Sequence, residues 1–441
     1  MNACSFSYQR QLTLSAQRLR LAQKLEAAPN ECVGHWQQMQ LRSHFQPIIS
    51  PTHRRTVGYE ALLRASQNEQ ALSPLAAFAR CETDEAIASM DLLCLLLHVF
   101  NFQRLQKQDA WLFVNVRNEQ INTQNMRAGL MRRMLARHGL QPDNIVLEIL
   151  EDAVSDPGLL ADFVHHYREE GFLVAIDDFG AGQSNFDRIW RIEPNIVKLD
   201  RSMIANAAAN PKQQRLLPKL VALLRETGAL VLIEGIETQR EALLALDSEA
   251  DLLQGYYFAR PSAQGSVSRE LSTHIRDLHH ISYQSQLAQL RRRSHKKALL
   301  RQSIEDACQS LQLSLDLSAA TQSLLAHPAV KRIYLLNRHG VQIHETLSPH
   351  PSCQHRLEAA QTTSKTTLHY KPLRAAEGAL WARRTYFRNA LAQPGKVHFS
   401  QPYLGLPDAD LDITISQGFM HEAQGQLVVL CVDINAAFLD D

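Results

Sequence analysis

The sequence predicts an α/β chain in which a (β/α)8 barrel of the TIM type is followed by a long helical linker and a small α+β domain. From about residue 44, near-continuous apolar runs typical of buried parallel strands alternate with helix-like runs. Eight such runs within about 220 residues match the size of a TIM-type barrel. Residues 267–326 then carry no strand pattern, and a second alternation begins near residue 328. The periodicity alone also permits an open, doubly wound sheet.

The composition excludes several classes of protein. The 441 residues are 45% hydrophobic, which is enough for a sizeable core and for more than one domain. Lys and Arg (46) nearly balance Asp and Glu (45), so no overall field favours a nucleic-acid polymer or an anionic membrane. The apolar run at 92–100 is too short to span a bilayer, and the first residues lack a signal-peptide pattern. Seven scattered cysteines without a CxxC pair indicate a reducing cytoplasm.

The first elements are an N-terminal helical segment and the strands of the barrel. We expect an amphipathic helix over 11–28, within a segment bounded at 1–35, and a barrel domain at 36–265. Helix-like runs such as "PGLLADFVHHYREEG" separate most of the expected strands. These strands are 45–50, 59–64, 111–116, 145–150, 173–179, 195–200, 230–236 and 254–259.

Beyond the barrel, we expect residues 266–326 to form one or two long helices, a signalling or dimerising stalk of a homodimer. The basic stretch at 291–302 is at least as consistent with a solvated helix face. The last domain, 327–441, starts with a predicted hairpin around "RHG" and continues with a helix-like run over 377–392. Three strand-like runs follow, which is the pattern of a small α+β domain.

Polar residues end seven successive barrel strands, at the side where barrel enzymes carry their chemistry. They are Glu60, Asn115, Glu148, Asp177 with Asp178, Lys198, Glu234 with Glu237, and Gln254. Any one could be a satisfied structural group, but seven in succession favour bound cations, because an unpaired buried carboxylate costs on the order of several kcal/mol. Oxygen ligands suit Mg²⁺ or Mn²⁺, and two adjacent aspartates can serve two ions, as in phosphoryl displacement. Lys198 would orient a nucleophilic water.

At these residues the chain resembles the EAL-domain cyclic-di-GMP phosphodiesterases. "GYEALLR" is similar to the family signature, and seven further motifs follow the family order over about residues 40–263. They are "FQPI", "FVNV", "LEILED", "IDDFGAG", "PNIVKLDRSMI", "IEGIET" and "QGYYFARP". The resemblance implies a barrel with one reversed strand and metal-dependent hydrolysis of cyclic di-GMP to linear pGpG.

The resemblance also implies a role for each matching residue. Glu60, Asn115, Glu148 and Asp177 would bind the first ion, and Asp177 with Asp178 the second. Lys198 would position the water, and Glu234 would be the general base or a second-site ligand. The remaining matches are of three kinds: Glu237 and Gln254 complete the polar shell, Gln46, Leu62 and Arg64 touch the dinucleotide, and Glu151 braces the loop after the two aspartates.

The chain also departs from the family pattern. Gln183 and Asn185 alter the loop after the aspartates, which the family links to dimerisation and metal order. Further departures are Arg117, Leu150 and Ile233. Because none removes a ligand, an active enzyme is favoured. The alternatives are a catalytically silent cyclic-di-GMP receptor that relays binding through the linker and, more weakly, another metallophosphoesterase.

The C-terminal segment loosely resembles PAS or Cache sensor domains. The stretches that carry this resemblance are "RRTYFRNAL", "FSQPYLG" and "GQLVVLCVDI". If the domain binds a small molecule, the polar candidates for the pocket are Arg383, Arg384, Tyr386 and Tyr403. A ligand-free dimerisation module is the alternative, because a fold does not dictate function.

Overall fold

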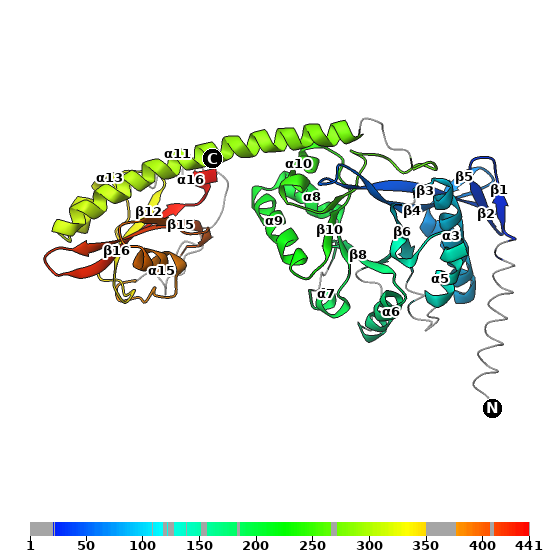
Figure 1. Ribbon diagram of the computed structural model, residues 1–441, viewed down its shortest axis with the longest axis horizontal. Coiled ribbons are helices and arrows are strands. Elements are labelled where there is room, and N and C mark those ends of the chain that lie inside the picture. Colours follow the sequence, from blue (N-terminus) through cyan, green and yellow to red (C-terminus); the bar gives the residue numbers. More distant parts are fainter. Residues whose placement is uncertain are drawn as a thin grey trace, which may run out of the picture. The chain divides into compact units, whose positions relative to one another are not determined.

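A computed structural model describes most of the chain, and it divides into two compact units, Met1–Tyr283 and Gln284–Asp441 (Figure 1). The described residues are 21, 23–107, 109–117, 121, 128–137, 139–150, 157–182, 186–265, 271–349, 376–405 and 410–440.

The first unit is built on a mixed barrel. Its strands close in the order β3-β11-β10-β9-β8-β7-β6-β4, because β4 pairs back onto β3. All neighbours are parallel except β3, which runs antiparallel to both β4 and β11. The predicted barrel with one reversed strand is therefore confirmed. The strands are β3 Met39–Ser50, β4 Arg55–Gln67, β6 Trp111–Val116, β7 Ile145–Leu150, β8 Leu173–Phe179, β9 Ile196–Leu199, β10 Leu230–Ile233 and β11 Leu252–Leu253.

Helices cover the outside of this barrel (Figure 1). They are α2 Pro74–Phe78, α3 Asp84–Arg104, α5 Ala128–Arg137, α6 Pro157–Glu169, α7 Phe186–Ile192, α8 Arg201–Ala209, α9 Pro211–Arg225 and α10 Gln239–Asp247, with a 3₁₀ turn η1 at Pro142–Asn144. Local signals start them: Thr238 and Glu241 form a capping box at α10, and the Thr83 side chain accepts from the Ala86 amide at α3. By length and composition α3 could cross a membrane, but it packs against β2 and β3 as a core helix does.

One layer of apolar side chains fills the barrel interior. Its members come from seven of the eight strands: Ile48, Phe113, Val146, Ala175, Ile196, Leu232 and Leu252. On the remaining strand Gly58 leaves room for this layer, because a Cβ there would lie 2.8 Å from the Phe113 ring. Side chains of a strand alternate between its two faces, so the next inward-facing position lies two residues further along. The layer therefore forms the floor beneath the inward-facing side chains at the carboxyl ends of the parallel strands.

Strands β3 and β4 extend beyond the barrel as an antiparallel ribbon, formed by residues 39–46 and 60–67. β1 Leu25–Ala27, β2 Cys32–Trp36 and β5 Gln70–Leu72 widen it. The helix expected over 11–28 is therefore wrong at its carboxyl end, because Leu25–Ala27 pair with β2 through a turn in which the Ala28 amide donates to the Glu31 carbonyl. Residues 1–20 lie outside the described part.

The seam between β3 and β11 closes the barrel with little strand pairing. The strand expected at 254–259 is wrong, because β11 covers Leu252–Leu253 and turns follow it. Within the described residues, β11 and β3 share one register pair, Leu253 with Ile49. Turns follow β11 because Gly255 packs against the Ile236 backbone, where a Cβ would lie 2.0 Å from the carbonyl oxygen. The chain returns to β3 at Ser262, whose amide and carbonyl both bond to Phe45.

The second unit is an antiparallel sheet with helices on both faces. Its strands are β12 Val330–Asn337, β13 Val397–Phe399, β14 Tyr403–Leu404, β15 Leu411–His421 and β16 Gln426–Asn435, in the order β12-β16-β15-β13 with β14 beside β15. One face packs on the end of α11 Leu271–Leu313 and on α12 Leu317–Ala320 and α13 Gln322–Leu325; the other packs on α15 Thr385–Ala392. A last helix, α16, spans Ala437–Asp440.

The expected helical linker and α+β domain are thus present, with two differences. The beginning of α11 belongs to the core of the first unit, through Leu271, Ile275 and Leu278. The helix expected over 377–392 forms only from Thr385, because the preceding residues bind the hairpin around Gly340 instead. The Trp381 amide donates to the Gly340 carbonyl at 2.7 Å.

Buried His98 makes the stability of the first unit depend on pH. Its Nδ1 lies 2.8 Å from Ser43 Oγ, which ties α3 to β3, and burial lowers the pKa of His98 from 6.5 to about 4. The unfolded chain therefore takes up the proton first. The contribution of His98 is intact above pH 6.5 and falls as the pH drops towards 4, by about 1.4 kcal/mol per pH unit.

We predict that wild type loses more stability than His98→Gln between about pH 7 and 4.5, by up to roughly 3 kcal/mol. Urea unfolding followed by tryptophan fluorescence measures both proteins at each pH. The carboxylates and the other histidines are the same in both proteins, so their effects cancel in the comparison. Parallel curves of stability against pH for the two proteins would contradict the role of His98.

Candidate active site

Seven of the predicted strand-end residues, one for each parallel strand, form a polar layer directly above the apolar floor of the barrel. Each lies two positions beyond a floor residue on a parallel strand, and Gln46 lies two before Ile48 on reversed β3. The pairs are Gly58 and Glu60, Phe113 and Asn115, Val146 and Glu148, Ala175 and Asp177, Ile196 and Lys198, Leu232 and Glu234, and Leu252 and Gln254. The period of two thus aims all of them into the mouth of the barrel.

Lys198 on β9 is the centre of this layer and is 1% exposed. Its Nζ lies 2.7 Å from Glu148 Oε1 and 2.8 Å from Asp177 Oδ1. Glu234 Oε2 follows at 3.3 Å and Glu60 Oε2 at 3.9 Å. One ammonium group therefore contacts acids from four other strands or strand ends.

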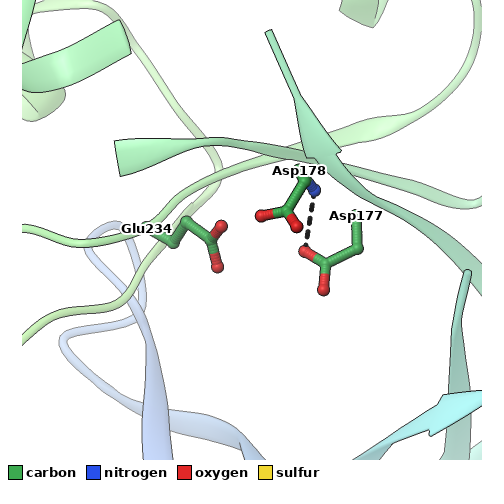
Figure 2. A group of neighbouring side chains, drawn as sticks. All are labelled: Asp177, Asp178 and Glu234. Carbon is green, nitrogen blue, oxygen red and sulfur yellow. Dashed lines mark hydrogen bonds between the residues drawn. The ribbon is translucent and has the colours of Figure 1, made fainter. Parts of the chain in front are cut away.

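A bulge in β8 lets two adjacent aspartates serve the same site. Successive side chains of a regular strand point to opposite faces, so a regular β8 would turn one of the two away. The pairing register between β8 and β9 shifts between Ile176 and Phe179, and Asp178 has the left-handed φ of 58°. Aspartate tolerates this conformation better than most residues do. Figure 2 shows the result: Asp177, Asp178 and Glu234 turn their carboxylates towards one another, with ligand oxygens within 4.8 Å.

The site holds more negative charge than its lysine can compensate. Burial raises the pKa of Glu234 to about 8 and that of Glu148 well above its usual value, against the opposing effect of Lys198. Burial and the neighbouring Asp177 also raise the pKa of Asp178. Burial alone would lower the pKa of Lys198, but the surrounding carboxylates raise it well above 10.5, so the lysine stays charged.

The residues present fit divalent cations. Four carboxylates lie within 4 Å of one ammonium group, and Asp178 adds a fifth beside Asp177 and Glu234. Glu148 Oε2 is buried without a hydrogen-bond partner among the described residues. Such an oxygen is costly unless a positive charge faces it. The donors are carboxylate and amide oxygens, which Mg²⁺ and Mn²⁺ prefer, and no thiol or imidazole joins them in the described part.

The other predicted residues of the barrel take different places. Gln254 donates to Glu60 Oε2 at 2.7 Å, so it holds a carboxylate in position. Asn115 is exposed at the mouth, in register with Glu148. Glu237 stands apart from the carboxylate cluster, on an exposed turn where it pairs with Arg201 at 2.7 Å. Leu62 and Arg64 are half-buried on the ribbon. Glu151, Gln183 and Asn185 lie outside the described residues.

In the second unit only part of the predicted sensor set comes together. The Tyr386 and Tyr403 rings stack at 6.2 Å, and the Arg384 guanidinium lies 5.2 Å from the Tyr403 ring. Arg383 is exposed and joins none of these contacts in the described part.

A buried ionic cluster beside these tyrosines was missed by the sequence reasoning. Arg332 bonds both Asp412 and Asp433, and Thr414 Oγ1 donates to Asp433 Oδ1 at 2.7 Å. Charged residues within the apolar strands β12, β15 and β16 were the available signal.

Residues 30–261 match the EAL domain family. Curated relatives are the probable cyclic di-GMP phosphodiesterase PdeB of Escherichia coli K12 and the cyclic di-GMP phosphodiesterase NbdA of Pseudomonas aeruginosa. PdeB is 21% identical over 58% of this chain and 49% of its own length; NbdA is 26% identical over 59% and 33%. This chain therefore spans half or less of the length of these relatives.

A solved structure shares the fold of both units. The Bacillus subtilis YkuI protein, crystallised in complex with substrate c-di-GMP and calcium, superposes with a TM-score of 0.72 over 90% of this chain and 96% of its own, at 21% identity. None of these comparisons identifies the C-terminal domain as PAS-like or Cache-like. The family match covers more than half of the chain and includes every element of the carboxylate site, so this chain belongs to the EAL domain family.

Proposed function

We propose that this chain is a metal-dependent phosphodiesterase that hydrolyses cyclic di-GMP to linear pGpG. The observation that carries the proposal is a group of five carboxylates, from three strands and the end of a fourth, of which four lie within 4 Å of the buried ammonium of Lys198. The family match and the activities in the names of PdeB and NbdA support the substrate. A silent receptor would not need every one of these carboxylates.

The reaction adds water across one phosphodiester bond. The water oxygen loses a proton and attacks phosphorus, the bond from phosphorus to O3′ breaks, and O3′ takes up a proton to become a hydroxyl. The product keeps a 5′-phosphate. Glu60, Asn115, Glu148 and Asp177 would hold one Mg²⁺ or Mn²⁺, and Asp178, Glu234 and a shared Asp177 the other. When bound, two such divalent cations stabilise the charge on the attacking and leaving oxygens.

Lys198 and Glu234 would manage charge and protons. Lys198 stays protonated, so its N–H groups can orient the water and face the phosphate charge. Glu234 is 3.3 Å from Lys198 Nζ and partly open to solvent, so its ionised form can accept the proton that the water loses. Gln254 keeps Glu60 aimed inward.

The setting of the enzyme is also part of the proposal. The five described cysteines are free and buried, which suits a cytoplasmic enzyme. We propose a homodimer in which the C-terminal unit acts as a PAS-like or Cache-like sensor. A small molecule would bind near Arg384, Tyr386 and Tyr403, and its binding would regulate the barrel.

The direct test is turnover of cyclic di-GMP, resolved from pGpG by nucleotide chromatography with Mg²⁺, Mn²⁺, Ca²⁺ or chelator. Wild type should form pGpG with Mg²⁺ or Mn²⁺ and not with chelator. Glu60→Ala should lower kcat by at least about a hundredfold, because it removes a metal-ligand carboxylate. Glu226→Ala, an exposed acid at the end of α9, is the matched control. Binding without turnover in every metal would establish the receptor instead.

A second prediction concerns the charge balance of the site. Lys198→Ala leaves the carboxylates without their cation and should reduce the free energy of unfolding of the first unit by about 3–5 kcal/mol without divalent ions. Added Mn²⁺ should raise the Tm of this variant more than that of wild type, because the cation replaces the lost positive charge. Thermal unfolding with and without Mn²⁺ measures both effects, with exposed Lys212→Ala as control. Equal Tm values for Lys198→Ala and wild type would show that the ammonium does not hold the site together.

A further inference from the structure

The inner face of the ribbon carries a group of side chains that the carboxylate site does not use. In an antiparallel pair, residues opposite each other lie on the same face. Glu60 faces Gln46, and the next position outward pairs Leu62 with His44, followed by Arg64 with Arg42. The opposite face is apolar and packs on the core, through Leu41, Phe45, Leu63 and Ala65. His44, Leu62 and Arg64 therefore stand together just beyond Glu60.

The charges around His44 are unequal. Arg42 forms an ion pair with Glu31, whereas the Arg64 guanidinium donates only to the Leu63 carbonyl within the described residues. Most donors of Arg64 thus remain available at the mouth of the site. Both arginines and Glu31 act electrostatically on His44.

The imidazole of His44 presents an acceptor. Burial and the nearby Arg64 lower the pKa of His44, so the ring is neutral at neutral pH. The ring also interacts with the backbone of Pro261, which has a carbonyl group but no N–H. A ring nitrogen that donates to this carbonyl leaves the other nitrogen as an acceptor.

We propose that His44 is a specificity-determining residue that reads guanine together with Arg64 and Leu62. This inference rests on the proposed function. Guanine presents N7 and O6 as acceptors and, next to O6, the donor N1–H. Arg64 can donate to N7 and O6, His44 accepts from N1–H, and Leu62 packs on the face of the base. The order of donors and acceptors on the ribbon is complementary to that edge.

Adenine reverses this order. It places an amino donor where guanine has O6 and an acceptor where guanine has N1–H. An adenine base in this position would place its amino group, a donor, against the Arg64 donors. It would place its N1, an acceptor, against the acceptor nitrogen of His44. A recognition site rejects a ligand that leaves its polar groups unpaired. His44 therefore separates cyclic di-GMP from cyclic di-AMP.

The experiment compares the Kd values of cyclic di-GMP and cyclic di-AMP by calorimetry in chelator, and the kcat and KM values for cyclic di-GMP in Mn²⁺. His44→Ala should lower the preference for the guanine dinucleotide by about tenfold, through weaker binding of cyclic di-GMP and with kcat little changed. His44→Gln, whose amide oxygen can accept, should restore part of it. His35→Ala removes an exposed histidine of the same sheet and should leave the preference unchanged.

The outcomes separate this inference from the proposed function. If wild type binds cyclic di-GMP without cleaving it, the catalytic proposal fails, and the two Kd values still test His44. If wild type cleaves cyclic di-GMP and His44→Ala keeps the full preference, the role of His44 is overturned while the enzyme stands. A structural role alone would weaken both dinucleotides equally and would also overturn it. Wild type that neither binds nor cleaves either dinucleotide would overturn both.

Discussion

The contact between the Lys198 ammonium and its carboxylates decides how the barrel unit is organised. Burying these acids is costly, and only a charge at their centre makes the arrangement stable without metal. The apolar floor below them excludes water and strengthens each contact. The bulge in β8 and the amide of Gln254 both serve to bring carboxylate oxygens from several strands to one point.

The sequence was most informative where periodicity alone decided the structure. The bounds expected for β6, β7 and β8 agree with the structure, and Glu148, Asp177 and Lys198 meet because parallel strands end at one edge. The sequence-based prediction was wrong at β1, because pairing with β2 overrides the local preference for helix. It was also wrong at β11, where the close approach of Gly255 to another backbone segment ends the strand early. The left-handed φ of Asp178 and the cross-strand register of His44 depend on tertiary contacts that no local pattern encodes.

In the second unit, the sequence predicted the elements better than the contacts between residues. Its helix and strands were expected, but the residues that share a face were only partly foreseen: Tyr386 and Tyr403 stack, whereas Arg383 does not join them. Arg332 on β12 is 80 residues from Asp412 and 101 residues from Asp433, so its pairing with them follows from the sheet topology. The stability of this unit therefore depends on hydrogen bonds and ion pairs to its buried polar groups as well as on apolar packing.

The short seam of the barrel has a consequence for its motions. β3 and β4 share a long ladder, whereas β3 and β11 share one register pair and the bonds of Phe45 with Ser262. Amide protons along this join should exchange with solvent by local opening, well before those of β6 to β9. Because the Gln254 to Glu60 bond crosses the same join, each such opening would release the Glu60 carboxylate while the remainder of the barrel stays folded.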